Sequence, residues 1–544
     1  MSSLRCLLGK SRNYQELYES FKWPAPERFN IAREICDSWA EAEPDRLAII
    51  HKTPEGPLLH ISYGELYTRA NKLANALRNS GLSKRDRIAL LLPQCPQTAI
   101  AHIAAYKLGS VAVPLASLFG HAALEYRLNN SGAKAMITDA AGLAKITQIR
   151  DRLEHLDLVT CIDGANSGAE GFDAFCEGHA EEFETEDTLI DDWAVMVYTS
   201  GTTGPPKGAL HAQRVLLGHM PGVEFSHDFF PQEGDLMWTP ADWAWAGGLF
   251  NIMFPALYYG VPLLACNFTK FDPEKAFALM EEAKVRNAFI PPTALRLLRA
   301  VESPSKRFKL SLRTIASGGE TLGRETLAWG REELGLTINE FYGQTECNYV
   351  LASSNSIDVV KPGSIGKVVP GHVVGVIDDQ GNELRPGEQG QIAIKRPNPN
   401  MFLEYWQRPD ATAKKFIGDW MTTGDQGMID EEGYISFVGR DDDVITSAGY
   451  RIGPGEIEDC LLKHPSVRLA AAVGKPDPLR TEIVKVFIVL KDGFSPTAEL
   501  EKELGLFVRE NLSAHEYPRE IEFIDEMPMT STGKVIRRLL RDQT

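Results

Sequence analysis

Short runs of Val, Ile, Leu and Ala recur from about residue 87 onward, with helical patterns between them. These runs do not alternate with polar residues, which is typical of strands buried on both faces. Buried strands that alternate with helices predict an α/β fold with a largely parallel sheet. The runs are RIALLLP (87–93), VAVPLAS (111–117), AKAMITD (133–139), LDLVTCID (156–163), WAVMVYT (193–199), VPLLAC (261–266), NAFIPP (287–292) and LRTIASGG (312–319).

The pattern changes between residues 368 and 395, where two alternating strands flank a turn that contains glycine. This pattern predicts a β-hairpin. We therefore expect a β-rich subdomain at about residues 350–438, appended to the α/β core. The core and this subdomain together form the predicted large N-terminal domain, residues 1–438.

A second change comes at GRDDDVITSAGYRIGPGEIE, residues 439–458, where three successive acidic residues and four glycines interrupt the apolar pattern. We place a domain boundary there, with a hinge at residues 439–443. The remaining residues, 444–544, alternate helix and strand patterns over about one hundred residues, a normal domain size. They predict a small α+β domain.

One uncharged segment, residues 244–268, is long enough to span a bilayer. Glycine and proline interrupt it at several positions. This punctuation favours a buried helix that ends at Gly260, followed by a buried strand. We therefore expect no membrane span.

The chain has 544 residues, more than one hydrophobic core usually organises, so two or more domains are expected. Its formal net charge of −17 argues against nucleic-acid binding, which depends on clustered Lys and Arg. The eight cysteines form no CxxC pair and no zinc-type cluster, which is typical of reduced thiols. The N-terminal apolar run is too short for a signal peptide. We expect a cytoplasmic protein, and the sequence leaves open whether it forms a homodimer.

The apolar strand at residues 193–199 leads directly into YTSGTTGPPKG, residues 198–208. Ligands bind at the carboxyl ends of strands in open α/β sheets. Backbone N–H groups of glycine, several hydroxyls and one lysine in such a loop can hold a polyphosphate. A flexible surface turn is the alternative, and two prolines break the Walker pattern. The candidate residues are Thr199, Ser200, Gly201, Thr202, Thr203, Gly204 and Lys207.

Further motifs follow in order along the chain: SGGE (317–320), YGQTE (342–346), TTGD (422–425), GRDDD (439–443), GYRIGPGEIE (449–458) and TGK (532–534). Together with TSGTTGPPKG, this series resembles the AMP-forming acyl-CoA synthetases of the acyl-adenylate-forming superfamily, in particular the medium-chain type. The match covers nearly the whole chain. It implies that a carboxylic acid and ATP form an acyl-adenylate with release of pyrophosphate. The thiol of coenzyme A then attacks the adenylate, which gives acyl-CoA and AMP.

The resemblance implies ATP, Mg²⁺ and coenzyme A as cofactors, and it gives the N-terminal motifs their roles. Lys207 and the loop before it stabilise the departing pyrophosphate. Thr345 donates to the α-phosphate, and Glu346 is the magnesium ligand. Taken alone, Glu346 has the alternative of being a surface carboxylate after a turn. The residues implied for adenine are Gly318, Gly319, Glu320 and Tyr342.

The later motifs are implied to serve the ribose and the change between the two steps. Asp425 resembles the family's ribose-binding aspartate, and Arg440 its arginine beside the ribose and phosphates. Lys534 is implied to bridge the substrate carboxylate and the α-phosphate during adenylation. Taken alone, Lys534 would be a solvated lysine.

The hinge is implied to let a mobile C-terminal domain rotate between the two half-reactions. Asp442 matches the family's hinge residue. We expect Gly449 to line the channel for the pantetheine of coenzyme A, where a side chain would obstruct. Arg451 is a candidate partner for a phosphate or for a hinge carboxylate.

The segment MWTPADWAWAGGLF, residues 237–250, lies where the family builds its acyl pocket. Trp243, Trp245 and Gly247 are the candidates there, with ordinary core packing as the alternative for the tryptophans. Acetate-specific relatives carry a Trp at the position of Gly343, so glycine predicts a deeper pocket. We expect a medium-chain, branched or aromatic acid rather than acetate, and Asn348 is placed to hydrogen-bond a polar substituent.

Two alternatives stay open from the sequence. The first is a free-standing adenylation enzyme that loads a carrier protein, and the second is a non-catalytic sensor of nucleotides or acyl groups. Retention of all the expected charged residues argues against a sensor that has lost catalysis. These residues are Lys207, Glu346, Asp425, Arg440 and Lys534.

Overall fold

The computed structural model describes most of the chain, which folds into two compact units. Unit 1 consists of Met1–Pro362, Gly366–Val373 and Lys395–Asp419, and unit 2 of Gly363–Ile365, Val374–Ile394 and Trp420–Thr544. The described residues are 5–53, 56–165, 168–199, 205–268, 270–440, 443–447, 450–477, 480–512, 516–529 and 534–544.

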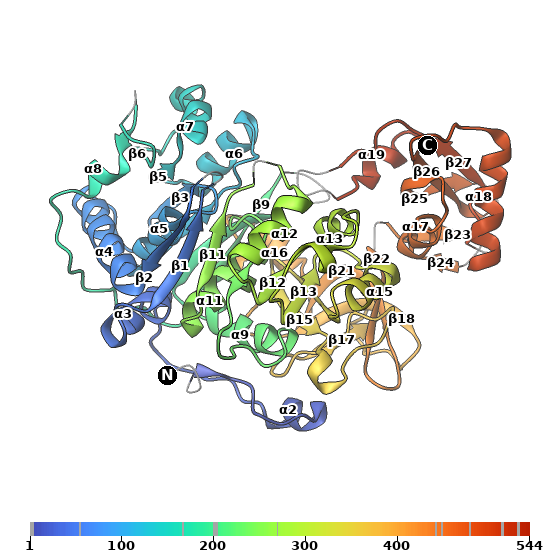
Figure 1. The fold of residues 1–544 in the computed structure, drawn as a ribbon, viewed down its shortest axis with the longest axis horizontal. Helices are drawn as coiled ribbons and strands as arrows, with labels where there is room; N and C mark the ends of the chain where they lie inside the picture. The colour runs from blue at the N-terminus through green and yellow to red at the C-terminus, as the bar shows by residue number, and fades with distance from the viewer. Residues whose placement is uncertain are drawn as a thin grey trace. The chain divides into compact units, whose positions relative to one another are not determined.

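The predicted parallel α/β core is confirmed in the first of two sheets of unit 1 (Figure 1). The strand order is β19-β9-β8-β4-β3-β5-β6-β7. The strands from β8 to β7 run parallel, whereas β9 and β19 are antiparallel to their neighbours. Their bounds are β3 (Arg87–Leu91), β4 (Val111–Pro114), β5 (Ala135–Thr138), β6 (Leu158–Cys161), β7 (Glu170–Gly171), β8 (Trp193–Thr199), β9 (Lys207–Ala212) and β19 (Glu404–Tyr405).

The second sheet of unit 1 has the order β16-β15-β14-β13-β12-β10-β11-β1-β2. Its strands from β14 to β1 run parallel, and the strands at both edges are antiparallel. Their bounds are β1 (Leu47–Lys52), β2 (Leu58–Ser62), β10 (Met237–Trp238), β11 (Leu263–Cys266), β12 (Asn287–Phe289), β13 (Thr314–Gly318), β14 (Ile338–Gln344), β15 (Cys347–Ala352) and β16 (Lys367–Val368).

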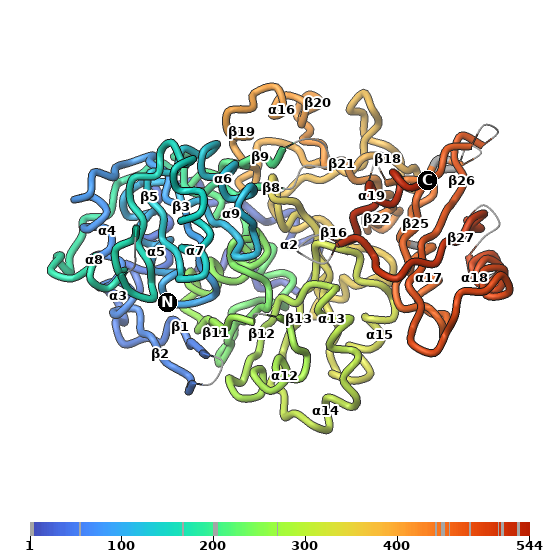
Figure 2. The backbone as a smooth tube through the Cα atoms, turned by 90° about the horizontal axis from the view of Figure 1, so that it is seen from above, coloured from blue at the N-terminus to red at the C-terminus, as the bar shows by residue number. Residues whose placement is uncertain are grey.

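Helices pack against both sheets and close two apolar cores. The neighbouring strands β3 and β5 lie side by side in Figure 2 as they do in Figure 1. The described helices of unit 1 are α2 (Tyr14–Ser20), η1 (Arg33–Asp37), α3 (Ser38–Ala42), α4 (Tyr63–Asn79), α5 (Pro96–Lys107), α6 (His121–Ser131), α7 (Ala140–Thr147), η2 (Arg150–Arg152), α8 (Phe172–Cys176), α9 (Val215–Ser226), α10 (Ala246–Gly248), η3 (Leu249–Met253), α11 (Phe254–Tyr259), α12 (Pro273–Glu282), α13 (Pro292–Leu298), α14 (Pro304–Arg307), α15 (Arg324–Glu333), η4 (Asn355–Ile357) and α16 (Pro409–Ala413).

The uncharged segment 244–268 forms the buried helix and strand that its punctuation predicts. The helix α11 ends at Gly260, which has a φ of 68° and so adopts the left-handed conformation that glycine allows. All four residues of the following strand β11 are buried. No helix within the described part of the chain is both long enough and apolar enough to cross a membrane.

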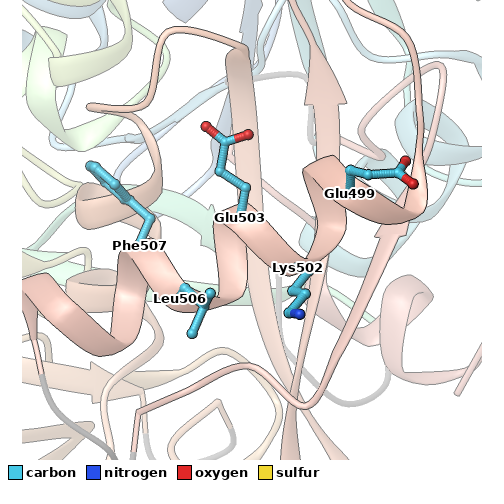
Figure 3. Close-up of a pocket in the computed structure, with 5 residues that line it drawn as sticks. All are labelled: Glu499, Lys502, Glu503, Leu506 and Phe507. Atoms are coloured by element: carbon cyan, nitrogen blue, oxygen red, sulfur yellow. The ribbon is translucent and has the colours of Figure 1, made fainter.

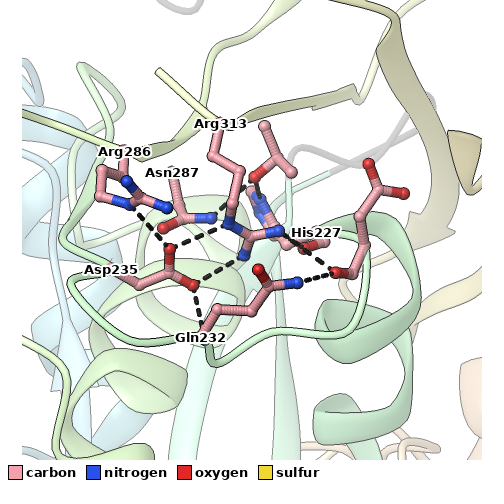
Figure 4. A network of polar contacts seen from close by, with 8 residues as sticks. His227, Gln232, Asp235, Arg286, Asn287 and Arg313 are labelled. Carbon is pink, nitrogen blue, oxygen red and sulfur yellow. Dashed lines mark hydrogen bonds and ion pairs between the residues drawn. The ribbon is translucent and has the colours of Figure 1, made fainter. Parts of the chain in front are cut away.

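A polar network holds the amino ends of three neighbouring strands of the second sheet (Figure 4). Asp235, Arg286 and Arg313 come just before β10, β12 and β13, respectively. The Asp235 side chain is fully buried, and its carboxylate lies 2.7 Å from Nη2 of Arg313 and 3.3 Å from Nε of Arg286. Ligands bind at the carboxyl ends of parallel strands. The network therefore stabilises the ends of these strands that lie opposite the ligand-binding ends.

Unit 2 contains a β-rich part and the C-terminal α+β module. In the β-rich part, β17 (Val374–Ile377) and β18 (Gln389–Lys395) form the predicted antiparallel hairpin. A second hairpin joins β21 (Trp420–Ile429) and β22 (Ile435–Arg440). These strands share more contacts with the C-terminal module than with unit 1, and so they belong to unit 2. The predicted hinge is only partly described, so the boundary at residues 439–443 stays a prediction.

The C-terminal module has a sheet of order β24-β23-β26-β25, with β27 paired to β26. Its helices cover a core of its own, as the sequence pattern predicts. The elements are β23 (Ile445–Ser447), β24 (Tyr450–Ile452), α17 (Pro454–Leu461), β25 (Val467–Asp477), β26 (Thr481–Leu490), α18 (Ala498–Asn511), β27 (Glu520–Phe523) and α19 (Arg537–Arg541).

Candidate functional site

The glycine-rich loop joins β8 and β9 at the carboxyl end of β8, where the sequence predicts a phosphate site. Thr199 and Lys207, the two ends of this loop, pair across the hairpin. The hydroxyl of Tyr126 on α6 donates to the carbonyl of Pro206 at 3.0 Å. The other predicted phosphate-binding residues lie outside the described residues: Ser200, Gly201, Thr202, Thr203 and Gly204.

Tyr405 links Lys207 and Glu346, which come from different motifs. It pairs with Ala209 where β19 joins β9. Nζ of Lys207 lies 4.7 Å from the centre of the Tyr405 ring, a cation–π contact. The hydroxyl of Tyr405 donates to the carboxylate of Glu346. Two motifs that are far apart in the sequence therefore meet at this tyrosine.

The environment of Glu346 holds its carboxylate in one place. Glu346 is 8% exposed, and its backbone carbonyl accepts from the N–H of Phe402 at 2.7 Å. Burial and the charge of Glu346 both raise the pKa of Tyr405, so the phenol keeps its proton and donates. The sequence pattern does not single out Tyr405, because the segment around it carries no recognised motif.

The residues predicted for adenine lie at the carboxyl ends of β13 and β14. Gly318 pairs with Phe341. A Cβ at Gly318 would lie 2.5 Å from the Phe341 carbonyl oxygen, so glycine permits the close approach of these strands. Gly319 has a φ of 93°, which also favours glycine. Tyr342, the next residue of β14, is half-buried.

Glu320 has protein partners at the end of β13. Nη2 of Arg296 lies 2.7 Å from its carboxylate, and the hydroxyl of Thr293 donates to it at 2.8 Å. Both partners come from α13. The side chain of Glu320 thus ties α13 to the loop after β13, a structural contact that the resemblance does not predict.

The predicted pocket residues Trp243, Trp245 and Gly247 differ in burial. Trp243 is 1% exposed, whereas Trp245 is half-buried and makes an edge contact with the ring of Phe119, 5.7 Å between centroids. A Cβ at Gly247 would lie 2.7 Å from the ring of Phe289. Gly247 therefore lets Phe289 pack directly against the backbone of α10.

Gly343 lies against the neighbouring strand β15. A Cβ there would be 2.4 Å from the backbone nitrogen of Tyr349 and 2.5 Å from Cα of Asn348. The strand pairing is irregular between Tyr342 and Gln344, as at a β-bulge. The absence of a side chain at Gly343 is therefore required by the hairpin itself.

Asn348 belongs to a buried group of amides. Its Nδ2 donates to Oδ1 of Asn251 at 2.7 Å, and its backbone carbonyl accepts from Nδ2 of Asn400. Asn251 lies in η3, a π-helix of the kind that often occurs at functional sites. The bond to Asn251 orients the Asn348 side chain, and the bond from Asn400 holds its backbone.

Two buried histidines contact the ring of Phe250, the residue before Asn251 in η3. The ring of Phe250 is 5.3 Å from His211 and 4.8 Å from His219, centroid to centroid. Burial lowers the pKa of His211 to about 3 and that of His219 to about 4. Both imidazoles are therefore neutral near pH 7. Sequence reasoning does not find them, since neither lies in a motif with a defined role.

The remaining predicted site residues belong to unit 2. Asp425 is buried and pairs with Arg440 between β21 and β22. Its backbone N–H donates to the hydroxyl of Thr423 at 3.1 Å, which shapes the turn of the TTGD motif. Lys534 is exposed. The structure thus pairs the backbones of Asp425 and Arg440, which the resemblance places at the same ribose.

Three predicted residues around the hinge are described only in part or not at all. Asp442 and Gly449 lie outside the described residues. The backbone of Arg451 pairs with Thr446 between β23 and β24, and its side chain is outside the described part. The roles of these residues stay predictions.

A shallow hollow follows one face of α18 in the C-terminal module (Figure 3). Its lining residues all come from that one helix: Glu499, Lys502, Glu503, Leu506 and Phe507. None of them belongs to a motif. The residues that line this hollow are therefore not among the predicted site residues.

The sequence matches two family models that together cover most of the chain. Residues 36–406 match the model described as AMP-binding enzyme, and residues 456–534 match the model described as AMP-binding enzyme C-terminal domain. The chain belongs to the AMP-binding enzyme family. The resemblance inferred from the motifs is confirmed.

Members of this family are similar to the chain over almost its full length. The acetyl-coenzyme A synthetase of Bacillus subtilis (strain 168) is 35% identical, over 97% of this chain and 95% of that protein. The mitochondrial acyl-coenzyme A synthetase ACSM3 of Mus musculus is 33% identical, over 97% of this chain and 93% of that protein.

Solved structures of family members agree with the fold. The acyl-CoA synthetase of Brucella canis is 34% identical, with a TM-score of 0.76 and coverage of 98% of both chains. The anthranilate CoA ligase AuaEII in complex with anthranoyl-AMP is 26% identical, with a TM-score of 0.87 and coverage of 95% of this chain and 98% of that one.

The protein is therefore an AMP-forming acyl-CoA synthetase. It uses ATP to convert a carboxylic acid to an acyl-adenylate with release of pyrophosphate. It then transfers the acyl group to coenzyme A, which gives acyl-CoA and AMP. The predicted enzyme class is confirmed, and so is the use of ATP and coenzyme A.

Proposed function

We propose that this synthetase activates a medium-chain, branched or aromatic acid rather than acetate. In the resemblance, glycine at position 343 takes the place of the Trp that closes the pocket in acetate-specific relatives, while its packing against β15 is explained by the hairpin alone. The observation that carries the proposal is the structural similarity to an anthranilate CoA ligase, which supports an aromatic acid. The similarity to an acetyl-coenzyme A synthetase makes acetate the competing substrate.

A polar substituent on the acid is the second part of this proposal. The buried amides of Asn348 and Asn251 are bonded to each other, and Phe250, the residue before Asn251 in η3, contacts two neutral histidines. Each amide keeps one polar atom that the bond between them does not use, and an alkyl chain beside these atoms would offer them no partner. A hydroxyl or amino group on the acid would offer them a partner.

Magnesium is expected at Glu346. No group of three or more metal-binding side chains occurs among the described residues. Mg²⁺ usually binds through one or two carboxylates together with the phosphates of the substrate, so the single carboxylate of Glu346 can serve as its protein ligand. When bound, the ion would neutralise charge that develops on the phosphates. Glu346, held by Tyr405, would supply the carboxylate oxygen.

The other residues have roles in holding ATP and in the change between half-reactions. Lys207 would neutralise the departing pyrophosphate, and Thr345 would donate to the α-phosphate. Asp425 would accept from the ribose hydroxyls, with Arg440 beside the phosphates. Rotation at Asp442 would bring Lys534 to the reacting carboxylate for adenylation and withdraw it for thioester formation, with Gly449 and Arg451 then serving coenzyme A.

An acid panel tests the substrate. We would follow pyrophosphate release with and without coenzyme A, using acids from acetate to decanoate, benzoate, and benzoates with a hydroxyl or amino group. We expect kcat/KM for the preferred acid to exceed that for acetate by at least about tenfold, because each well-packed methylene group contributes about tenfold or more. Acetate as the best substrate would contradict the proposal. An unchanged ranking of acids in Asn348→Ala would contradict the proposed bond between Asn348 and a polar substituent of the acid.

A further inference from the structure

The helix that follows Lys534 is tied to two carboxylates by an ion network within unit 2. Arg537, the first residue of α19, donates from Nη2 to both carboxylate oxygens of Glu458, at 2.8 and 2.7 Å. Its Nη1 lies 3.5 Å from Oδ2 of Asp443. Arg541, one turn further along α19, donates to Oδ1 of Asp443 at 2.8 Å.

The network is largely shielded from water. The side chains of Asp443, Glu458 and Arg537 are 10%, 14% and 21% exposed. Glu458 also accepts from the backbone N–H of Ala472 on β25 at 2.9 Å. Burial raises the pKa of Glu458, and the positive charge of Arg537 opposes that rise. Removing one partner from such a network leaves a buried charge uncompensated, which is strongly unfavourable.

The network connects the predicted hinge with the segment that follows Lys534. Asp443 is the last residue of the predicted hinge, and its backbone N–H donates to the carbonyl of Arg440 at 2.9 Å. Arg537 follows Lys534 by three residues, a distance that even an extended chain limits to about 10 Å. Val535, the residue directly after Lys534, forms an isolated antiparallel bridge with Met529.

We propose that Arg537 is a positioning residue for adenylation. By bonding Glu458 and Asp443 at once, it fastens the loop of Lys534 to the hinge end of the C-terminal module. Hinge rotation then carries the ammonium group of Lys534 to a defined place. This inference rests on the proposed role of Lys534 in the first half-reaction. Arg537 acts through Lys534 and is not required to touch ATP or the acid.

Separate assays of the two half-reactions test the inference in the full-length protein. The variants are Arg537→Ala, Arg537→Lys, Lys534→Ala and, as a matched control, Arg538→Ala. Arg538 is the next residue of the same helix, and its exposed side chain has no ion pair among the described residues. Adenylation is measured as acid-dependent pyrophosphate release, and thioester formation from supplied acyl-adenylate and coenzyme A.

We expect Arg537→Ala to lower kcat for adenylation by about 10- to 100-fold, because small displacements of a reacting group cost that much. KM for ATP and thioester formation should stay close to the wild-type values. Arg537→Lys should recover part of the rate, since an ammonium can bond one of the two carboxylates. Arg538→Ala should behave like the wild type in both assays.

Three outcomes would overturn the inference. Unchanged adenylation in Arg537→Ala, with adenylation lost in Lys534→Ala, would remove the positioning role and keep the role of Lys534. Adenylation that survives in Lys534→Ala would contradict both the role of Lys534 in adenylation and the positioning role of Arg537. Equal loss of both half-reactions in Arg537→Ala and Arg537→Lys, together with a lower melting temperature, would show that Arg537 serves folding alone.

Discussion

Tyr405 shows how one side chain can organise two charged residues of opposite sign. Its ring faces the ammonium group of Lys207, and its hydroxyl holds the carboxylate of Glu346. A buried carboxylate without a donor would be costly, so the phenol stabilises Glu346 in the orientation seen. If Glu346 binds magnesium, Tyr405 is the partner that orients the ligand from behind.

Replacing Tyr405 by phenylalanine keeps the ring and removes the donor. We expect Tyr405→Phe to lower activity, or the apparent affinity for Mg²⁺, by about 10- to 100-fold, the usual cost of losing a partner of a metal ligand. A titration of pyrophosphate release against Mg²⁺ measures this. Tyr18→Phe is the control, because its hydroxyl donates to the carbonyl of His372 at 3.0 Å and contacts no charged group among the described residues. An unaltered Mg²⁺ titration in Tyr405→Phe would contradict the role.

The chemistry of single residues is partly readable from the sequence. Lys207 and Glu346 stand out because each lies in a motif whose composition suits phosphate or metal binding. Tyr405 does not stand out, because it is 59 residues from Glu346 and meets it only through the pairing of β19 with β9. The partners of Glu320 are likewise invisible until α13 is folded against β13.

The hairpin of β14 and β15 carries three predicted roles on two short strands. Tyr342 lies in β14, Thr345 in the turn between the two strands, and Asn348 in β15. Gly343 lets the two strands approach, and Tyr349 stacks on Phe341 with centroids 4.1 Å apart. A change at Gly343 should therefore disturb the hairpin before it alters a pocket.

Gly343→Ala distinguishes two interpretations of this glycine, namely that the hairpin packing requires it and that it deepens the acyl pocket. We expect Gly343→Ala to destabilise unit 1 by about 1–3 kcal/mol, the usual cost of overpacking, and to slow turnover of all acids alike. Melting temperature and the acid panel measure both effects. Gly120→Ala is the control, since a Cβ there meets nothing within 4 Å. A shifted preference among acids at wild-type stability would instead favour the pocket reading.

Periodicity predicts the elements far better than their order in the sheets. The apolar run 261–266 and the end of a helix at Gly260 are both found as predicted. Periodicity does not predict the pairing of β1 with β11. The paired residues of the two strands are more than 200 residues apart in the sequence, and no local pattern indicates which strands become neighbours. Strand order depends on contacts that only the complete fold provides.

The N-terminal segment shows how distant parts of unit 1 are joined. The backbone N–H groups of Leu7 and Leu8 donate to the two carboxylate oxygens of Glu224 on α9, each at 2.7 Å. The hydroxyl of Tyr259 also donates to Glu224. Further along, the hydroxyl of Tyr14 on α2 donates to the carbonyl of Val368 at 2.9 Å. One buried carboxylate therefore anchors the start of the described chain.

The titration of Glu224 makes the stability of unit 1 depend on pH. Burial raises its pKa from 4.5 to about 7, despite the donors that oppose this rise. Below pH 4.5 the group is protonated in both states. As the pH rises, the unfolded chain loses its proton first, so the free energy of unfolding decreases up to about pH 7 and is level above it. The total change is on the order of 3 kcal/mol.

Glu224→Gln cannot titrate and should lose this dependence. We expect the melting temperature of the wild type to fall relative to Glu224→Gln between pH 5 and pH 7, and the difference to be constant from about pH 8. Calorimetry between pH 5 and pH 8 measures these melting temperatures. It is the suitable method because it resolves separate transitions if the two units unfold independently. Glu177→Gln, at an exposed position, should follow the wild type throughout. If the curves of Glu224→Gln and the wild type run parallel, Glu224 is already ionised in the folded protein at pH 5, and its three donors then outweigh its burial.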